Sequence, residues 1–223
     1  MGASPIRASI MNKRKYSLND SFFDKWSPEM AYILGFWFAD GYMRHEKSYR
    51  IVFSSKDYNL LEKIKECLKS DYKIYKRKNG TEYQLVIYSK KMYKRLLSLG
   101  GERCKSKKIA FPEIPNPFLK DFIRGYFDGD GSVFFTKYTA SKNRKIYKEL
   151  RSNFTSGSQK FLEELQEILI EKFHLTRKKI IPCKNSCSKK LGYGTKDTLK
   201  LLKLMYYPNC SIKLDRKFNF LKK

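Results

Sequence analysis

The feature that most constrains this chain is a short pattern that occurs twice, at residues 33–41 and 123–131. Each copy combines apolar and aromatic residues with two small residues four positions apart, and each ends in Asp-Gly. The small residues are Gly35 and Ala39 in the first copy and Gly125 and Gly129 in the second. Residues four apart share one face of a helix, so each copy predicts a helix with a face that lacks bulk. Two such faces let helices pack more closely than the usual separation of about 8 to 10 Å.

The two Asp-Gly pairs predict where these helices end and what they hold. Glycine commonly adopts the left-handed conformation just past a helix C-terminus, and we expect this of Gly41 and Gly131. If the helices pack in the same direction, Asp40 and Asp130 lie side by side. The carboxylates then repel each other at the negative ends of both helix dipoles, which a divalent cation would relieve. Oxygen ligands without clustered His or Cys favour magnesium or calcium over zinc.

The alternative interpretation of each Asp-Gly is a helix end followed by a turn, with no chemical role. For a single copy this is the more common case, because the dipeptide is frequent in turns. Two copies in matching contexts instead favour two related units that meet at a shared site.

The composition predicts a polyanionic partner. The 223 residues include 48 Lys and Arg against 22 Asp and Glu, a formal net charge of +26. This charge would attract nucleic acid or an anionic membrane. No apolar run approaches the ~18 residues that span a bilayer, and no signal-peptide pattern opens the chain. The charge is also spread along the whole length among 16 Tyr and 16 Phe, which favours nucleic acid, although any single basic run can be a solvated face.

The five cysteines show no zinc-binding spacing, and their odd number favours reduced thiols in an intracellular protein. We assign no metal-binding or catalytic role to His45 or His174. The sequence would look the same in an organelle, whether mitochondrion or chloroplast, in a bacterium or in a phage. We therefore expect an intracellular protein and do not assign it to a compartment.

The duplication extends beyond the two short copies. Residues 50–68 align without a gap to residues 151–169. Gly35 and Gly125 are 90 residues apart, whereas these blocks are 101 apart, so the second half carries about eleven extra residues, expected around 141–148. We therefore expect an N-terminal extension and two halves, divided near Pro112, Pro115 and Pro117, with the boundaries 1–27, 28–115 and 116–223.

Each half predicts an α+β unit in the order helix, strand, strand, helix, strand, strand, helix. Helical spacing of Leu and Ile marks the later helices, at residues 56–69, 90–99, 158–173 and 196–205. Hairpins are expected at 72–88, with Asn79-Gly80 at the turn, and at 177–195, with Asn185-Ser186 near the turn.

Alternation along the strands predicts one face for the core and one for a partner. Phe53, Phe154 and Ile51 fall on the core side, whereas Val52 and polar neighbours fall on the other. A sheet face of this kind can lie in a major groove and read base edges. Our candidate DNA contacts are Tyr42, Arg44, Arg50, Lys73, Arg77, Ser132, Thr136, Tyr138, Arg151 and Asn153. An ordinary solvated face is the alternative for any one of them.

With Lys105-Ser106, Phe111-Pro112, Ile114-Pro115 and the run 122–131, the chain resembles the LAGLIDADG homing endonucleases in their two-motif monomeric form. The resemblance covers nearly the whole chain, from about residue 27 to 220. It implies two αββαββα halves related by a pseudo-twofold axis, with Gly35, Ala39, Gly125 and Gly129 at the interface between the motif helices. It also implies two saddle-shaped antiparallel sheets that grip a long, nearly palindromic double-stranded DNA site.

The resemblance further implies a site-specific endonuclease that cuts both strands across the minor groove and leaves short 3′ overhangs. Asp40 and Asp130 would coordinate the metal ions together with the main-chain carbonyls of Ala39 and Gly129. Mg²⁺ is the expected cofactor, and Ca²⁺ is expected to support binding without cleavage. A lysine near each site is typical of the family, and the candidates are Lys105 and Lys213, followed by Lys107 and Lys217.

One departure from the family pattern is Phe38, which stands where the second motif has Asp128. We expect this difference to alter helix packing and to leave cleavage intact. Two alternatives remain: an RNA maturase that binds intron RNA and assists splicing, and a non-catalytic regulator on the same scaffold. The second is disfavoured because both terminal Asp residues are present. We expect a monomer without an obligate protein partner or membrane, and leave open whether the gene is intron- or intein-associated.

Overall fold

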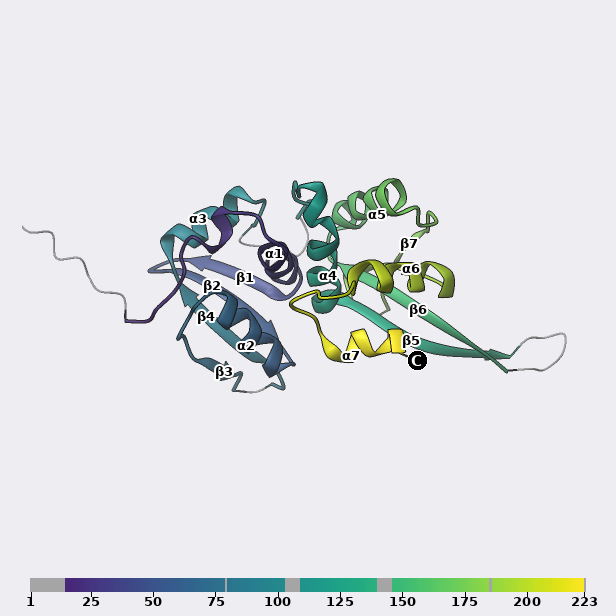
Figure 1. The fold of residues 1–223 in the computed structure, drawn as a ribbon, viewed down its shortest axis with the longest axis horizontal. Coiled ribbons are helices and arrows are strands. Elements are labelled where there is room, and N and C mark those ends of the chain that lie inside the picture. The colour runs from purple at the N-terminus through teal and green to yellow at the C-terminus, as the bar shows by residue number, and fades with distance from the viewer. Residues whose placement is uncertain (1–14, 79, 103–108, 140–145, 185, 223) are drawn as a thin grey trace, which may run out of the picture.

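The computed structural model describes residues 15–78, 80–102, 109–139, 146–184 and 186–222 and forms two similar halves side by side (Figure 1). A short 3-10 turn, η1 (Phe22–Asp24), precedes the first half. The first half consists of α1 (Pro28–Asp40), β1 (Gly41–His45), β2 (Tyr49–Ser55), α2 (Tyr58–Cys67), β3 (Ile74–Lys76), β4 (Tyr83–Tyr88) and α3 (Lys90–Ser98).

The second half repeats this order after a 3-10 turn, η3 (Asn116–Phe118). It consists of α4 (Leu119–Asp130), β5 (Gly131–Thr139), β6 (Ile146–Ser156), α5 (Gln159–Phe173), β7 (Ile180–Pro182), β8 (Lys189–Tyr193) and α6 (Thr195–Met205). The chain then adds α7 (Asp215–Phe218) and the 3-10 turn η4 (Asn219–Lys222). The predicted order of elements is confirmed, while Asn79, Asn185 and residues 141–145 of the expected insertion lie outside the described residues.

Each half contains one four-stranded antiparallel sheet, with the strand orders β1-β2-β4-β3 and β5-β6-β8-β7. The predicted α+β class is therefore confirmed. Phe53 and Phe154 are fully buried at the core face of the two sheets, as alternation predicts. Val52 lies on the opposite face, as alternation predicts, and it is nevertheless fully buried. Its cross-strand neighbours Tyr42 and Val86 flank it in the register of β1, β2 and β4.

The centre of the molecule is the contact between α1 and α4. A Cβ atom on Gly35 would overlap the main-chain oxygen of Phe122, and one on Gly125 would overlap that of Tyr32. Farther along, a Cβ on Gly129 would overlap the Ala39 side chain. The contacts advance in the same direction along both helices, so the helices run parallel and their C-termini meet. The backbones can approach this closely only because both crossing positions are glycine.

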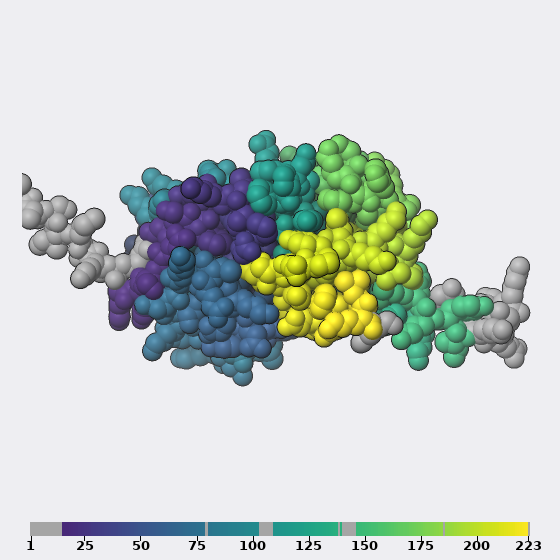
Figure 2. Space-filling view, in the orientation of Figure 1, coloured from purple at the N-terminus to yellow at the C-terminus, as the bar shows by residue number. Residues whose placement is uncertain are grey.

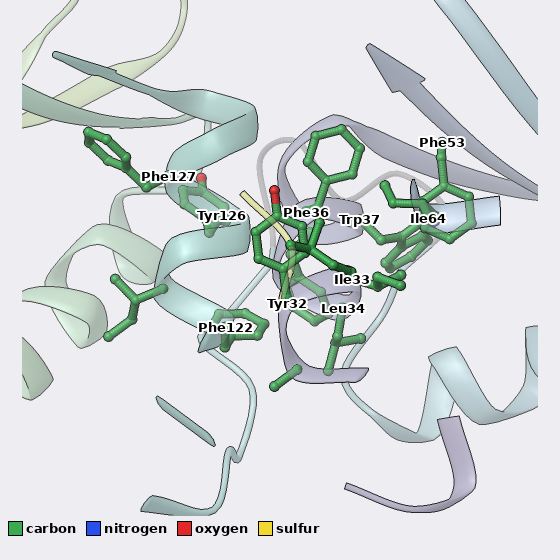
Figure 3. Packing of buried hydrophobic residues seen from close by; sticks show 14 of the residues in the cluster. Tyr32, Ile33, Leu34, Phe36, Trp37, Phe53, Ile64, Phe122, Tyr126 and Phe127 are labelled. Atoms are coloured by element: carbon green, nitrogen blue, oxygen red, sulfur yellow. The ribbon is translucent and has the colours of Figure 1, made fainter. Parts of the chain in front are cut away.

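The aromatic residues of the two helices divide between this contact and the two sheets (Figure 3). Tyr32 and Phe36 lie between the helices, while Trp37 points toward the first half near Ile64. Phe127 points away from α1 and packs edge-on against Phe154, with ring centroids 5.2 Å apart. Residues Met30 to Phe38 of α1 are all buried, since both halves cover this helix.

The expected left-handed conformation of the two motif glycines is wrong. Gly41 and Gly131 have φ values of −94° and −87° with extended ψ, and each begins a strand directly after the helix. Glycine is needed there for space, because a Cβ on Gly41 would overlap the Trp37 ring and one on Gly131 the Phe127 ring. This close approach lets the backbone of each half turn from helix into strand within one residue.

Asp128 joins three segments beneath the helix pair. The hydroxyls of Tyr206 and Tyr32 donate hydrogen bonds of 2.6 and 2.8 Å to its carboxylate, and the Leu214 amide donates one of 2.9 Å. Burial raises the pKa of the Asp128 carboxyl, while the nearby charge of Lys217 opposes that shift. The carboxylate thereby ties α4 to α1 and to the C-terminal segment that carries α7.

Phe38 occupies the matching position of the first motif and has an aromatic environment instead. Its ring packs edge-on against Trp37 and Phe122, at centroid distances of 5.8 and 5.5 Å. The departure from the family pattern therefore changes packing, and its expected lack of effect on cleavage stays a prediction.

Replacing Gly35 with Ala should weaken the helix pair, because the new methyl group meets the Phe122 carbonyl. We expect the free energy of unfolding to fall by about 1 to 3 kcal/mol, the usual cost of overpacking. Denaturant unfolding measures this, with Gly80→Ala as the control. A Cβ at Gly80 would have its nearest neighbour at 3.6 Å, an ordinary contact. Equal stability of the two variants would contradict the close helix contact.

Replacing Asp128 with Ala should leave two buried tyrosine hydroxyls without their acceptor and the buried Lys217 ammonium without a nearby opposite charge. The expected loss is about 3 to 5 kcal/mol of unfolding free energy, as for other broken buried pairs. Tyr206→Phe removes a single hydrogen bond and should cost only about 1 kcal/mol. The matched control is Asp215→Asn, because the Asp215 side chain is 68% exposed. Thermal unfolding that ranks Asp215→Asn as the most destabilising variant would refute this role.

Candidate active site and nucleic-acid interface

Asp40 and Asp130 are the last residues of α1 and α4, and both are partly exposed. Their helices run parallel in contact, and the Asp40 Oδ2 atom lies 3.3 Å from the place a Cβ of Gly129 would take. Burial raises the pKa of the Tyr126 hydroxyl, and the charges of Asp130 and Asp40 both raise it further. The structure therefore brings the two predicted carboxylates into one region.

A pocket of about 550 Å³ opens beside Asp40. Its floor includes Ala39 and Gly129 from the ends of the two motif helices. The lining also includes polar and cationic side chains of the first sheet, of the residues that directly follow β2 and β3, and of α7, namely Tyr42, Gln84, Lys56, Arg77 and Arg216. The lining therefore combines the Asp40 carboxylate with three cationic side chains. Lys56, Gln84 and Arg216 were not among our candidates, since their places depend on how the sheet and α7 fold back.

Lys217 is almost fully buried under the C-terminus of α4, with 2% of its surface exposed. Its ammonium donates hydrogen bonds to the main-chain carbonyls of Phe127, Asp128 and Gly131, the last two at 3.0 and 2.6 Å. Carbonyls at a helix C-terminus lack partners within the helix, and a cation there also suits the helix dipole. Burial lowers the Lys217 pKa to about 8, although the Asp128 charge opposes this shift. Lys217 thus fixes the backbone on both sides of Gly129 and Asp130.

The other lysine candidates do not share the position of Lys217. The Lys213 ammonium lies 4.8 Å from the centre of the Phe218 ring. Lys105 and Lys107 lie outside the described residues. Of the two candidates within the described ranges, Lys217 has the ammonium seated at the end of a motif helix. Sequence spacing could not separate Lys213 from Lys217, because both belong to one short basic segment.

The oxygen atoms at the two helix ends suit a hard divalent cation. In the described part of the chain, no group of three or more His, Cys, Asp or Glu residues could hold a metal ion. The predicted donors, the carboxylates of Asp40 and Asp130 and the main-chain carbonyls of Ala39 and Gly129, belong to the last two residues of α1 and α4. Mg²⁺ and Ca²⁺ accept such ligands and complete their coordination with water or phosphate oxygens.

The outer faces of the two sheets carry most of the candidate nucleic-acid contacts. In the first half, the Arg50 guanidinium lies 5.9 Å from the Tyr42 ring centre, and Arg44, Lys73 and Arg77 are exposed. In the second half, Ser132, Thr136 and Asn153 are half-buried and Arg151 is exposed, while the side chain of Tyr138 lies outside the described residues.

A second pocket, of about 380 Å³, lies over the second sheet. Its lining combines aromatic, amide and cationic side chains, including Phe134, Arg151, Asn153, Lys178, Lys179 and Lys190. Cationic side chains of this kind suit phosphate contacts, while amide and aromatic groups suit base edges. This face therefore has the chemistry of a groove-binding surface.

Two further expectations concern the cysteines and the membrane. Cys67, Cys183, Cys187 and Cys210 are free thiols, and Cys104 lies outside the described residues. No helix in the described ranges combines the length and apolar character needed to cross a membrane.

Solved structures with a similar fold include homing endonucleases bound to DNA. One is the I-LtrWI LAGLIDADG homing endonuclease bound to target DNA, with a TM-score of 0.61 and 13% identity over 86% of this chain and 87% of that one. Another is the LAGLIDADG meganuclease I-AabMI bound to uncleaved DNA, with a TM-score of 0.63 and 17% identity over 88% of both chains. I-SmaMI, bound to uncleaved DNA in the presence of calcium ions, gives a TM-score of 0.58 and 14% identity over 88% of this chain and 89% of that one.

Two curated relatives have different names and are much longer than this chain. "Probable translation initiation factor IF-2" of Thermococcus kodakarensis is 29% identical over 147 residues, which are 62% of this chain and 11% of the relative. "DNA-directed RNA polymerase subunit Rpo1C" of Methanocaldococcus jannaschii is 30% identical over 154 residues, which are 66% of this chain and 16% of the relative. The similarity is therefore confined to a small part of each of these proteins.

The family model described as LAGLIDADG-like domain matches residues 27–101 and again residues 117–203. These two matches fall on the two halves of the fold, and each includes one motif helix. The chain therefore belongs to the LAGLIDADG family and carries its domain twice.

Proposed function

We propose that this protein is a site-specific DNA endonuclease that hydrolyses both strands of a long, pseudo-palindromic duplex with the help of divalent cations. One observation carries the proposal: Asp40 and Asp130 end two parallel helices in contact, between two sheets with basic outer faces. The related solved structures named above hold DNA, which supports a duplex as the partner. The net charge of +26 supports the same partner.

In this proposal the sheet faces bind the duplex and the helix ends position the reaction. Cationic side chains of both sheets contact phosphates, and the pseudo-twofold arrangement presents one carboxylate to each strand. Asp40 and Asp130 would hold a divalent cation, which would supply an activated water and a positive charge that stabilises the departing 3′ oxygen. The Asp40 and Asp130 carboxylates would keep this cation at the helix ends. The Lys217 hydrogen bonds keep the backbone around Gly129 and Asp130 from shifting. Cleavage across the minor groove then leaves short 3′ overhangs.

The finer parts of the proposal concern cofactor, assembly and setting. We infer Mg²⁺ as the working cation and Ca²⁺ as a substitute that permits binding without cleavage. The protein would act as a monomer, because one chain contains both halves of the site. It would act inside the cell, where the genome is its target.

Asp40→Asn and Asp130→Asn should each abolish double-strand cleavage in Mg²⁺, because a neutral amide is a poor ligand for a hard cation. We expect cleavage to fall by more than about 100-fold, beyond the loss typical when a residue that only supports a ligand is removed. Binding to the same duplex in Ca²⁺ should change only a few-fold. The substrate comes from a randomised duplex library selected first for binding and then for cleavage. Asp215→Asn is the matched control and should cut normally.

The outcomes separate the candidate functions. An Asp130→Asn variant that still cuts both strands would remove this residue from the site. A wild-type chain that cuts no duplex but binds intron RNA and speeds its splicing would replace the proposal with the maturase alternative. Binding of duplex without cleavage in any divalent cation would favour a non-catalytic regulator.

The DNA footprint should extend farther on the side of the second half. Strands β5 and β6 have nine and eleven residues, whereas β1 and β2 have five and seven. In Figure 1 the β5–β6 hairpin projects well beyond the helices. Four extra residues at about 3.3 Å each correspond to roughly four base pairs.

Duplexes shortened stepwise from either end provide the measurement, with affinity determined in Ca²⁺. Shortening should weaken binding earlier on the side that the second half occupies. The midpoint of the site is located by the cleavage positions in Mg²⁺. Equal tolerance at both ends would contradict an extended grip by β5 and β6.

A further inference from the structure

The two sheets differ at one matching row of residues on their outer faces. In the second sheet, Ser132, Asn153 and Gly192 are direct cross-strand partners on β5, β6 and β8. In the first sheet, the same row consists of Tyr42, Val52 and Val86 on β1, β2 and β4. The duplicated fold thus places an amide at the centre of one row and an aliphatic side chain at the centre of the other.

The Asn153 side chain fits closely between its two neighbours in the row. It lines the pocket of about 380 Å³ over the second sheet, together with Gly192. Its Nδ2 atom lies 3.5 Å from the Ser132 hydroxyl, on one side. On the other side, a Cβ at Gly192 would come within 2.7 Å of the Asn153 Oδ1 atom. The amide fits between the neighbouring strands because one neighbour is small and the other has no side chain.

The matching row of the first sheet is closed. Val52 is fully buried, and the Tyr42 ring beside it also lies against the Arg50 guanidinium. The central strand therefore offers no polar side chain to a groove at this position. Any base facing this row meets aromatic and aliphatic surface.

The cationic side chains near Asn153 have other partners or roles, so the Asn153 amide can contact a base itself. Nε and Nη2 of Arg151 both donate to a Glu149 carboxylate oxygen, at 3.0 and 2.9 Å. This pairing holds the guanidinium, the usual reader of guanine, along its own strand. Lys190 and Lys179 also line the pocket and can serve phosphates.

We propose that Asn153 reads an adenine in the half-site held by the second half, and that the pseudo-symmetric base pair of the other half-site has no such readout. An Asn amide matches adenine in the major groove, since Oδ1 accepts from the N6 amino group and Nδ2 donates to N7. This inference rests on the proposed function, because it requires a duplex on the sheet faces. It assigns one base to one residue and makes the two half-sites unequal.

The test is selection of bound duplexes from a randomised library in Ca²⁺, with wild type, Asn153→Ala, Gly192→Ala and Val52→Ala in parallel. Wild type should select adenine at one position by about tenfold or more over other bases, the order expected for a bidentate contact. Asn153→Ala should lose the preference at that position and retain the others. Gly192→Ala should weaken the same preference, because the added methyl group displaces the amide. Val52→Ala, at the pseudo-symmetric place, should leave it intact.

Each result decides the inference. A wild-type profile without a position that depends on Asn153, in a protein that does bind duplex, overturns the readout and leaves the proposed function standing. An Asn153→Ala variant that keeps every preference does the same. Failure of the wild-type chain to bind any duplex overturns the proposed function and this inference together. Thermal unfolding and affinity for a fixed nonspecific duplex show that each variant is folded.

Discussion

The close contact between α1 and α4 is the constraint on which the rest of the structure depends. Gly35 and Gly125 each face a main-chain oxygen of the other helix, so at these two positions the backbones touch with no side chain between them. This contact sets the two helices parallel and brings Asp40 and Asp130 to the same end. A wider crossing would separate the carboxylates and open the core that Tyr32 and Phe36 fill between the helices (Figure 3). The fold and the candidate site are therefore consequences of one packing geometry.

Buried charge next to this contact determines where the C-terminal segment lies. Arg124 is fully buried and donates to Asp121 at 2.8 Å and to the main-chain oxygens of Ile212 and Met205 at 2.9 and 3.0 Å. Buried ion pairs add little net stability, since desolvation offsets their attraction, but leaving one partner unpaired is costly. The segment therefore folds over α4 in a register that gives hydrogen-bond partners to Arg124, Asp128 and Lys217. Figure 2 shows the result, with the yellow C-terminal residues lying against both halves, where Lys63 and Asp215 approach to 3.8 Å.

Local patterns predicted most of the fold because they depend on neighbouring residues. Helix spacing, strand alternation and the duplicated motif gave the element order and the parallel helix pair. Two features escaped because they depend on residues far apart in sequence. The tyrosines that hold Asp128 come from positions 96 and 78 residues away, and Lys217 is 86 residues from the carbonyl of Gly131. The role of Gly41 was missed for another reason: its demand for space comes from the Trp37 ring and cannot be distinguished in sequence from a demand for positive φ.

A single chain with two halves can vary its surface while its interface stays fixed. The helix contact requires matching small residues in both motifs, and both have them at Gly35 and Gly125. The sheet faces carry no such requirement, because they do not touch each other through that contact. The two sheets differ in strand length, because β5 and β6 are longer than β1 and β2. They also differ in chemistry, because Asn153 occupies the position that corresponds to Val52 in the first half. A symmetric dimer would have to present identical faces, so duplication within one chain would permit the proposed recognition of a site whose two halves differ.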